Sequence, residues 1–245
     1  MKDFMDKSNL NNNNKTLDVL LILFLPLLFA PFIISKKLLN IFIYCSNEYP
    51  YTLSFIKFAI LATFGEIVSY RISRKSYPDK SFGILPKMVV WGILGMAIKA
   101  SFVIFGSGSV ALLNSIIPSI KLTVLSTKGF SYLKLFASFF VSLTMNLVFA
   151  PVMMTCHKML DIIIIESNGT FRGFFKKNSF GNLLSKVNWE EYGGFVLAKT
   201  IPFFWIPAHT ITFLLPASFQ VLFAALLSIM LGIFLAYKPK SKNKI

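Results

Sequence analysis

Hydrophobic residues in this chain gather in long runs that short polar or basic segments separate. The runs extend from Leu17 to Ile34, from about Thr52 to Tyr70, from Gly83 to Gly106, and from Tyr132 to about Thr155. A helix needs about 20 residues to cross the hydrocarbon core of a bilayer, which is about 30 Å thick. The pattern therefore predicts membrane-spanning helices, in which every backbone polar group is satisfied within the segment.

The last apolar run, from Phe195 to Tyr237, is too long for a single span. Its 43 residues would form about 64 Å of helix, roughly twice the hydrocarbon core. A turn at Leu215–Ser218 resolves this length, because Pro216 lacks a backbone donor and disfavours helix at Leu215. The sequence thus predicts six spans in one all-α polytopic helical bundle.

The remaining segments complete the predicted domain organisation. Residues 1–16 are polar, contain four consecutive asparagines and predict a disordered tail. Residues 17–237 form a single transmembrane helical domain, and residues 238–245 form a basic tail. The stretches 38–50 and 107–131 are interfacial or re-entrant in this interpretation. The fourth span can continue as helix through Asp161.

The composition agrees with a membrane location. The chain is 55% hydrophobic and 14% charged, with a mean hydropathy of +0.67. Soluble domains carry about 25% charged residues, so a soluble globule of this composition would expose very large apolar patches. We expect an integral membrane protein whose main partner is the lipid bilayer.

The charge pattern predicts the orientation. There are 25 Lys and Arg against 10 Asp and Glu, for a net charge of +15. The basic residues lie between apolar runs, as they do in cytoplasmic loops, so we expect no nucleic-acid partner. Counting them by loop places both termini on the cytoplasmic side.

Polar groups inside the predicted spans are the candidate functional residues, because such groups are costly in lipid. The candidates for a polar path are Glu66, Lys99, Asn146, His157, Asp161, Lys199 and His209. Glu66 and Lys199 lie one to two turns from the cytoplasmic ends of their spans, which predicts an ion pair. Lys99 and His209 lie nearer the outer side.

Four polar residues on the fourth span share one helix face. Ser142, Asn146, His157 and Asp161 fall within about 100° of one another at 100° per residue. Such a stripe suits a narrow hydrated path. It suits equally well a set of hydrogen bonds that only hold neighbouring helices together.

Enzyme signatures are missing from the sequence. It contains no His-Glu-x-x-His, Gly-x-Ser-x-Gly or Gly-Lys-Ser/Thr motif. His157 and Asp161 are too few ligands for a zinc site, and Cys45 and Cys156 suggest packing thiols. We expect no enzymatic activity, no metal and no cofactor.

Residues 135–237 resemble the Mpv-seventeen family, also called the peroxisomal twenty-two-kilodalton membrane protein family. The motif positions that carry the resemblance are Phe149, Pro151, Trp205, Pro207, Phe213, Pro216 and Phe219. Several polar positions of the family pattern differ here. His209 replaces a glutamine, Thr212 an asparagine, Gln220 an arginine and Met145 an aspartate.

The resemblance implies a multi-pass protein of an organelle or cell membrane. Peroxisomal, inner mitochondrial and bacterial cell membranes all remain open, as does the oligomeric state. Family members usually have four spans, so the family-like core would cover about residues 52–237. Some members resemble weakly selective channels for small solutes. We therefore expect a channel or transporter for small metabolites, or alternatively a non-conducting membrane scaffold or assembly protein.

Overall fold

The computed structural model describes residues 2–237, and every regular element in that range is helical. The prediction of an all-α protein is confirmed. The predicted basic tail, residues 238–245, lies outside the described residues. The long elements are α1 (Lys2–Ile34), α2 (Lys36–Glu48), α3 (Pro50–Arg74), α4 (Ile84–Ile116), α5 (Tyr132–Glu166), η4 (Tyr192–Trp205), α8 (Ile206–Leu214) and α9 (Ala217–Ala236). Short helices in the connections are η1 (Lys80–Phe82), η2 (Val124–Ser126), η3 (Phe171–Phe175), α6 (Phe180–Ser185) and α7 (Trp189–Glu191).

Five helical segments of the described chain are long and apolar enough to cross a membrane. They are Asn14–Ile34, Pro50–Arg74, Lys80–Ile116, Tyr132–Glu166 and Ala217–Ala236. These segments correspond to five of the predicted spans and suit an integral membrane helical bundle. The remaining predicted span, 195–214, is divided between η4 and α8.

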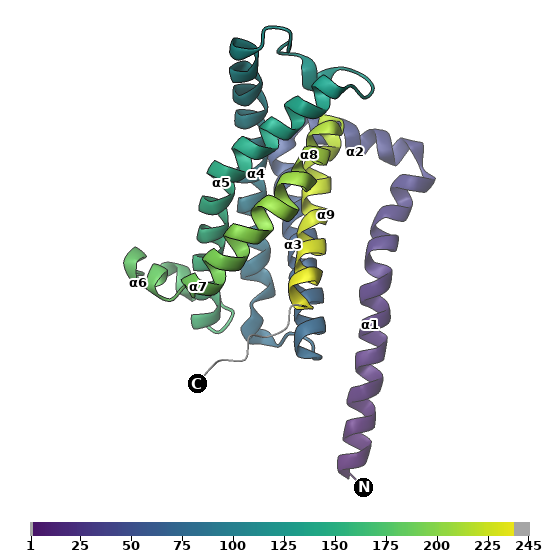
Figure 1. Ribbon diagram of the computed structural model, residues 1–245. Coiled ribbons are helices and arrows are strands. Elements are labelled where there is room, and N and C mark those ends of the chain that lie inside the picture. Colours follow the sequence, from purple (N-terminus) through teal and green to yellow (C-terminus); the bar gives the residue numbers. More distant parts are fainter. Residues whose placement is uncertain (1, 238–245) are drawn as a thin grey trace.

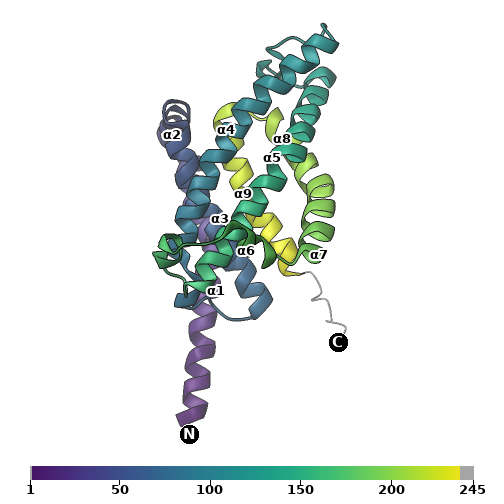
Figure 2. The same ribbon diagram turned by 90° about the vertical axis from the view of Figure 1, so that its left-hand side faces the viewer.

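The helices run alternately up and down the bundle (Figure 1). Helix α3 packs against α4 and α9, while α5 packs against α4 and α8. Helix α1 stands to one side, and α2 crosses the upper end of the bundle between α1 and α3. The start of α1 and the end of α9 lie at the same end (Figure 1). The turned view shows α4 and α5 reaching beyond the other helices at the opposite end (Figure 2).

Glycines allow the tight packing of α3. A Cβ added to Gly95 on α4 would lie 2.6 Å from the Phe58 Cβ and 2.7 Å from the Ser54 carbonyl oxygen. A Cβ on Gly65 would lie 2.9 Å from the Ile229 Cα of α9. Small residues of this kind let membrane helices approach closely and gain van der Waals contact.

The segment predicted as one straight span over 195–214 has an irregular backbone. Its first part, η4, is a π-helix, which holds Pro202, and Pro207 is the second residue of α8. Each proline removes one backbone donor, so the regular α-helical ladder is interrupted there. The segment still runs alongside α5 (Figure 1). The predicted turn that follows is confirmed, because α8 ends at Leu214 and α9 begins at Ala217.

Several predicted boundaries differ from the structure. Helix α1 begins at Lys2, so the segment predicted as a disordered tail, residues 1–16, is helical from that residue on. Residues 107–116 are not a separate piece but continue α4 to Ile116. Propagating an existing helix adds one hydrogen bond per residue, which favours such extensions. Helix α4 stops just before Pro118, whose ring disfavours helix at the preceding residue. Helix α5 passes Asp161 as expected and ends at Glu166.

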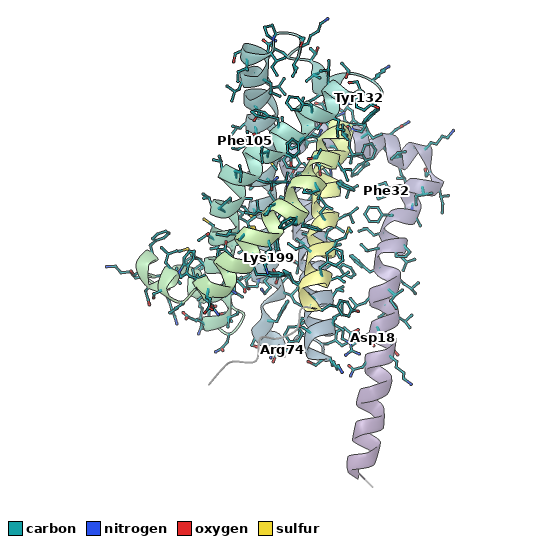
Figure 3. The ribbon with its side chains drawn as sticks, viewed as in Figure 1. Asp18, Phe32, Arg74, Phe105, Tyr132 and Lys199 are labelled. Atoms are coloured by element: carbon teal, nitrogen blue, oxygen red, sulfur yellow. The ribbon has the colours of Figure 1, made fainter. Side chains whose placement is uncertain are left out.

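An ion pair joins α1 to the bundle. The Arg71 guanidinium donates two hydrogen bonds of 2.7 Å to the Asp18 carboxylate, and the Tyr77 hydroxyl donates another of 2.7 Å. Burial and the Asp18 carboxylate raise the pKa of Tyr77 to about 12. Figure 3 shows Asp18 on α1 at the level of Arg74 near the end of α3. Asp18 lies inside the first apolar run, where the hydrophobic pattern concealed it.

The close contact of α3 and α4 predicts opposite effects for one substitution at two glycines of α4. Gly95→Ala should lower the free energy of unfolding by about 1–3 kcal/mol, because the added methyl overlaps Phe58. Gly106→Ala should be neutral or stabilise by up to about 1 kcal/mol, since no atom lies within 4 Å of its Cβ position. Thermal unfolding in detergent measures both. Equal effects of the two variants would contradict the close contact.

Candidate functional site

A network of charged side chains joins α3, α4 and α5. The Lys87 ammonium of α4 lies 2.6 Å from the Glu66 Oε2 of α3 and also contacts the Asp161 carboxylate of α5. The His157 Nε2 lies 3.3 Å from the Glu66 Oε1. The Trp91 indole donates a 2.6 Å hydrogen bond to the same Glu66 oxygen.

Helical spacing brings these side chains to one place. Lys87 and Trp91 are four residues apart on α4, and His157 and Asp161 are four apart on α5. Residues at this spacing lie on one face of a helix, one turn above the other. Each helix therefore presents two groups to Glu66.

The turn before α4 positions Lys87. Gly83 has a φ of 72°, in the left-handed region that favours glycine, and its carbonyl accepts the Lys87 amide at 3.0 Å. A Cβ at Gly83 would lie 2.6 Å from the Ile164 side chain of α5. Asp79 accepts hydrogen bonds from the Ser81 hydroxyl and amide, which lower the pKa of Asp79. The turn thus begins α4 close against α5.

The members of the network differ in how far they are covered. The Lys87 side chain is 6% exposed, whereas Glu66 retains 22% and Asp161 retains 18% of their side-chain surface. Lys87 is therefore enclosed between its two carboxylates, while each carboxylate keeps one accessible side.

That accessible side faces a cavity of about 930 Å³. Residues of α3, α4, α5, η4, α8 and α9 line it. At one end the lining includes Arg74, Asp79 and Lys158, which are exposed. At the other end it reaches Asn146 and His209, which are buried. The cavity therefore extends from the loop end of α3 and α4 to the interior of the bundle.

The buried end of the cavity contains a polar pair. The His209 Nδ1 of α8 lies 3.1 Å from the side-chain amide of Asn146 of α5. The Trp205 ring stacks on His209 with its centroid 5.1 Å away. The Trp205 Nε1 is buried and has no hydrogen-bond partner among the residues that the structure describes. This N–H group can therefore donate a hydrogen bond to an acceptor that enters the cavity.

Beyond His209 the bundle is tightly packed. The Phe102 ring lies 5.8 Å from the His209 ring and 5.1 Å from the Phe213 ring, measured between centroids. Phe213 is 1% exposed and belongs to the main hydrophobic core, together with Val141 and Met145. This aromatic layer closes the inner end of the cavity.

The structure brings five of the seven candidate path residues to the same cavity. They are Glu66, Asn146, His157, Asp161 and His209. The stripe predicted on α5 is also present, with Ser142 donating a 2.7 Å hydrogen bond to the Ile206 carbonyl of α8. Lys99 and Lys199 are not among the residues that line the cavity in the described part of the chain.

The predicted Glu66–Lys199 ion pair is wrong. Glu66 contacts Lys87 and His157 instead. Lys199 is exposed, and its ammonium lies 6.0 Å from the Phe195 ring. The prediction compared depths along two regular helices, but Lys199 lies in the π-helical segment η4, where residues follow one another at a different angle.

Lys99 belongs to a different surface. It is half-buried and lies near Lys57 of α3. The Lys57 ammonium donates a 2.9 Å hydrogen bond to the Ser46 hydroxyl of α2 and lies 4.5 Å from the Phe42 ring. Lys99 therefore lies near the contact of α2 with α3 and is not among the described residues that line the cavity.

Lys87 and Trp91 are the site residues that the sequence interpretation missed. Lys87 lies near the start of the predicted span 83–106, next to a basic loop, and a lysine there normally marks the cytoplasmic side. The helix begins at Ile84, so Lys87 lies in its first turn and points into the bundle. The spacing of four residues between Lys87 and Trp91 was the available signal.

Within the described chain, no group of three or more His, Cys, Asp or Glu side chains is placed to hold a metal ion.

The motif residues of the family resemblance take varied positions. Phe149 and Trp205 line the cavity, Pro151 lies within α5, and Pro207 lies within α8. Pro216 forms the turn before α9, and the Phe219 ring lies 5.9 Å from the Phe42 ring of α2.

The network predicts that two lysines respond very differently to the same substitution. Lys87→Met should lower the free energy of unfolding by about 3–5 kcal/mol, because it leaves two partly buried carboxylates without their cation. Lys199→Met should change it by less than about 0.5 kcal/mol, since its side chain is exposed. Denaturation in detergent at neutral pH measures both. A large loss for Lys199→Met would restore the discarded ion pair.

Comparison with protein-family models, with curated proteins and with solved structures finds no match to this chain. The resemblance to the Mpv-seventeen family therefore stays a prediction, which rests on the motifs of residues 135–237. The function has to be inferred from the cavity and the side chains that line it.

Proposed function

We propose that this protein is a multi-pass membrane channel or transporter that passes small metabolites across the bilayer with weak selectivity. The cavity of about 930 Å³ is the observation that carries this proposal. Binding cavities for small molecules commonly have volumes of about 300–1,000 Å³. The cavity has room for a metabolite. It combines charged side chains toward its mouth with polar side chains at its buried end.

The lining suits a hydrated path through half of the bundle. Exposed charged groups occupy its mouth, the network of Glu66 and Asp161 follows, and Asn146 with His209 lies deepest. Polar groups within a membrane bundle typically face such a water-filled cavity. A solute would then have to pass Phe102 and Phe213 to reach the other side, so we assign the gate to this aromatic layer.

The proposed topology has six spans with both termini in the cytoplasm. The sixth is the irregular segment of η4 and α8, which runs alongside α5 and turns back into α9. The mouth of the cavity lies at the end where Arg71, Arg74, Lys75 and Lys80 gather. The positive-inside rule assigns that end to the cytoplasm. The membrane would be a bacterial cell membrane, or a peroxisomal or inner mitochondrial membrane.

A non-conducting scaffold is the second candidate function. The hydrogen bonds that favour it join α5 to α8, from Ser142 to the Ile206 carbonyl and between Asn146 and His209. Contacts of this kind can serve only to hold helices together. The two candidates differ in whether the purified protein lets a solute cross a sealed membrane.

Solute flux through reconstituted vesicles tests the proposal. The protein should let small neutral solutes such as glycerol enter liposomes faster than they enter protein-free liposomes. Phe213→Ala should increase this flux severalfold, because it removes a ring from the layer that closes the cavity. Phe203→Ala is the matched control, since Phe203 is 82% exposed and lies outside this layer. It should leave the flux unchanged.

A cavity in the core can itself destabilise the bundle, since Phe→Ala there costs about 3–5 kcal/mol. Phe102→Leu keeps more of the volume and should increase the flux by a smaller factor. The original chain and both gate variants are each reconstituted after their folding has been checked. If all three folded proteins leave the vesicles as tight as protein-free vesicles, the result contradicts transport and favours the scaffold.

A further inference from the structure

The charges around Glu66 do not balance. When both are ionised, Glu66 and Asp161 carry two negative charges, and Lys87 supplies one positive charge between them. With a neutral His157 imidazole the network has one negative charge in excess. With a protonated imidazolium its net charge is zero. An uncompensated charge in a membrane bundle is costly, so a positive charge that binds at this place, a proton or another cation, is favoured.

Other titratable groups around the network do not change this count. Arg74 of α3, Asp79 of the loop and Lys158 of α5 line the exposed mouth, where water and salt screen them. From η4 the Tyr192 hydroxyl lies 3.1 Å from the Thr155 hydroxyl, and α3 adds the neutral hydroxyl of Tyr70. Helix α9 contributes the Ser228 hydroxyl, which donates to the Ala225 carbonyl.

Two other candidate path residues, His209 and Lys199, do not take part in the network. His209 lies at the level of Asn146, which is 11 residues, or about 16 Å, from His157 along α5. Lys199 is exposed and is not among the described residues that line the cavity. Within the described chain, no further ion pair joins the network.

The burial of the individual groups selects a cation as the ligand. An anion beside this network, away from the exposed mouth with Arg74 and Lys158, would need Lys87, but this ammonium is 6% exposed and already contacts two carboxylates. Glu66 and Asp161 keep 22% and 18% of their side-chain surface exposed, and both line the cavity. The accessible charge of the cavity interior is therefore negative.

Aromatic rings line the same cavity as these carboxylates, and Trp91 lies directly at the network. Trp91 contacts Glu66 through its indole nitrogen, and its ring centroid lies 4.2 Å from that of His157. Trp205, Phe149 and Phe195 also line the cavity. Aromatic faces attract cations, and they accommodate the apolar substituents of an organic cation better than those of a strongly hydrated metal ion.

We infer that this cavity binds a monovalent organic cation next to Glu66 and Asp161, and that the cation replaces a proton on His157. This inference rests on the proposed function, because it names the substrate class of the same cavity. His157 is the only described titratable side chain paired with Glu66 that ordinarily changes charge between about pH 5 and 8. Proton and cation would each restore neutrality, so they would bind in exchange for one another.

Two probe ions of the same shape and opposite charge test whether the site prefers a cation or an anion. Tetraphenylphosphonium and tetraphenylborate are titrated into the purified full-length protein in detergent by isothermal titration calorimetry. Tetraphenylphosphonium should bind more tightly by at least about tenfold, which corresponds to about 1.4 kcal/mol. Equal affinities would show that only apolar contact matters. Tighter binding of tetraphenylborate, or no binding of tetraphenylphosphonium, would also overturn the inference.

Matched variants locate the binding site. Glu66→Gln removes the excess charge and should weaken tetraphenylphosphonium binding by about tenfold or more. Glu166→Gln removes a carboxylate from the exposed Lys186 pair of the same bundle end and should leave the affinity unchanged. An equal loss in both variants would indicate unspecific attraction by the protein surface and would overturn the assignment.

The pH dependence tests the exchange with a proton. Below neutral pH the affinity for tetraphenylphosphonium should fall by up to about tenfold per pH unit, because one proton competes with one cation. His157→Gln keeps a side-chain donor for Glu66 but cannot be protonated, so it should bind the cation with little pH dependence. A pH dependence that persists in this variant would overturn the role of His157. This variant also decides the question if Glu66→Gln fails to fold.

The binding experiment separates this inference from the proposed function. It contains no membrane and measures no transport. A protein that passes glycerol but does not bind tetraphenylphosphonium would keep its proposed function and lose its proposed substrate class. A protein that binds the cation but conducts nothing would lose the proposed function while the cation site remains.

Discussion

The energetic constraint on which this structure depends is the burial of the Lys87 ammonium between α3, α4 and α5, in the first turn of α4. A charge in low dielectric is stable only when its partners are close and correctly oriented. Those partners come from two other helices, Glu66 from α3 and Asp161 from α5. The network therefore sets how far each of the three helices is shifted and rotated relative to the others.

The bundle divides into two parts around this constraint. In one part the rings of Phe58, Phe102 and Phe213 are buried and belong to the main hydrophobic core. Glycines such as Gly95 allow α3 and α4 to approach closely there. In the other part the charged network and its aromatic neighbours keep a cavity open. A closed half and an open half within one bundle are the arrangement that a gated path requires.

The amino-terminal helices are peripheral to both parts. Helix α1 is attached through the Asp18–Arg71 ion pair and the stacking of Phe24 on Phe64, whose centroids are 4.4 Å apart. Helix α2 contacts Lys57, whose ammonium donates a hydrogen bond to the Ser46 hydroxyl of that helix. None of the residues of α1 or α2 is among the described residues that line the cavity. The path would thus belong to residues 52–237, the predicted family-like core.

The sequence by itself determined the all-α class, the positions of the apolar helices, the turn at Pro216 and five polar residues of the cavity. These features depend on local hydrophobicity and on the rarity of polar groups in apolar runs, and both are visible along the chain. Only the tertiary structure decided the partner of Glu66. Partner choice depends on how helices rotate against one another. The π-helical turns of η4 leave Lys199 exposed, whereas the first turn of α4 brings Lys87 to Glu66.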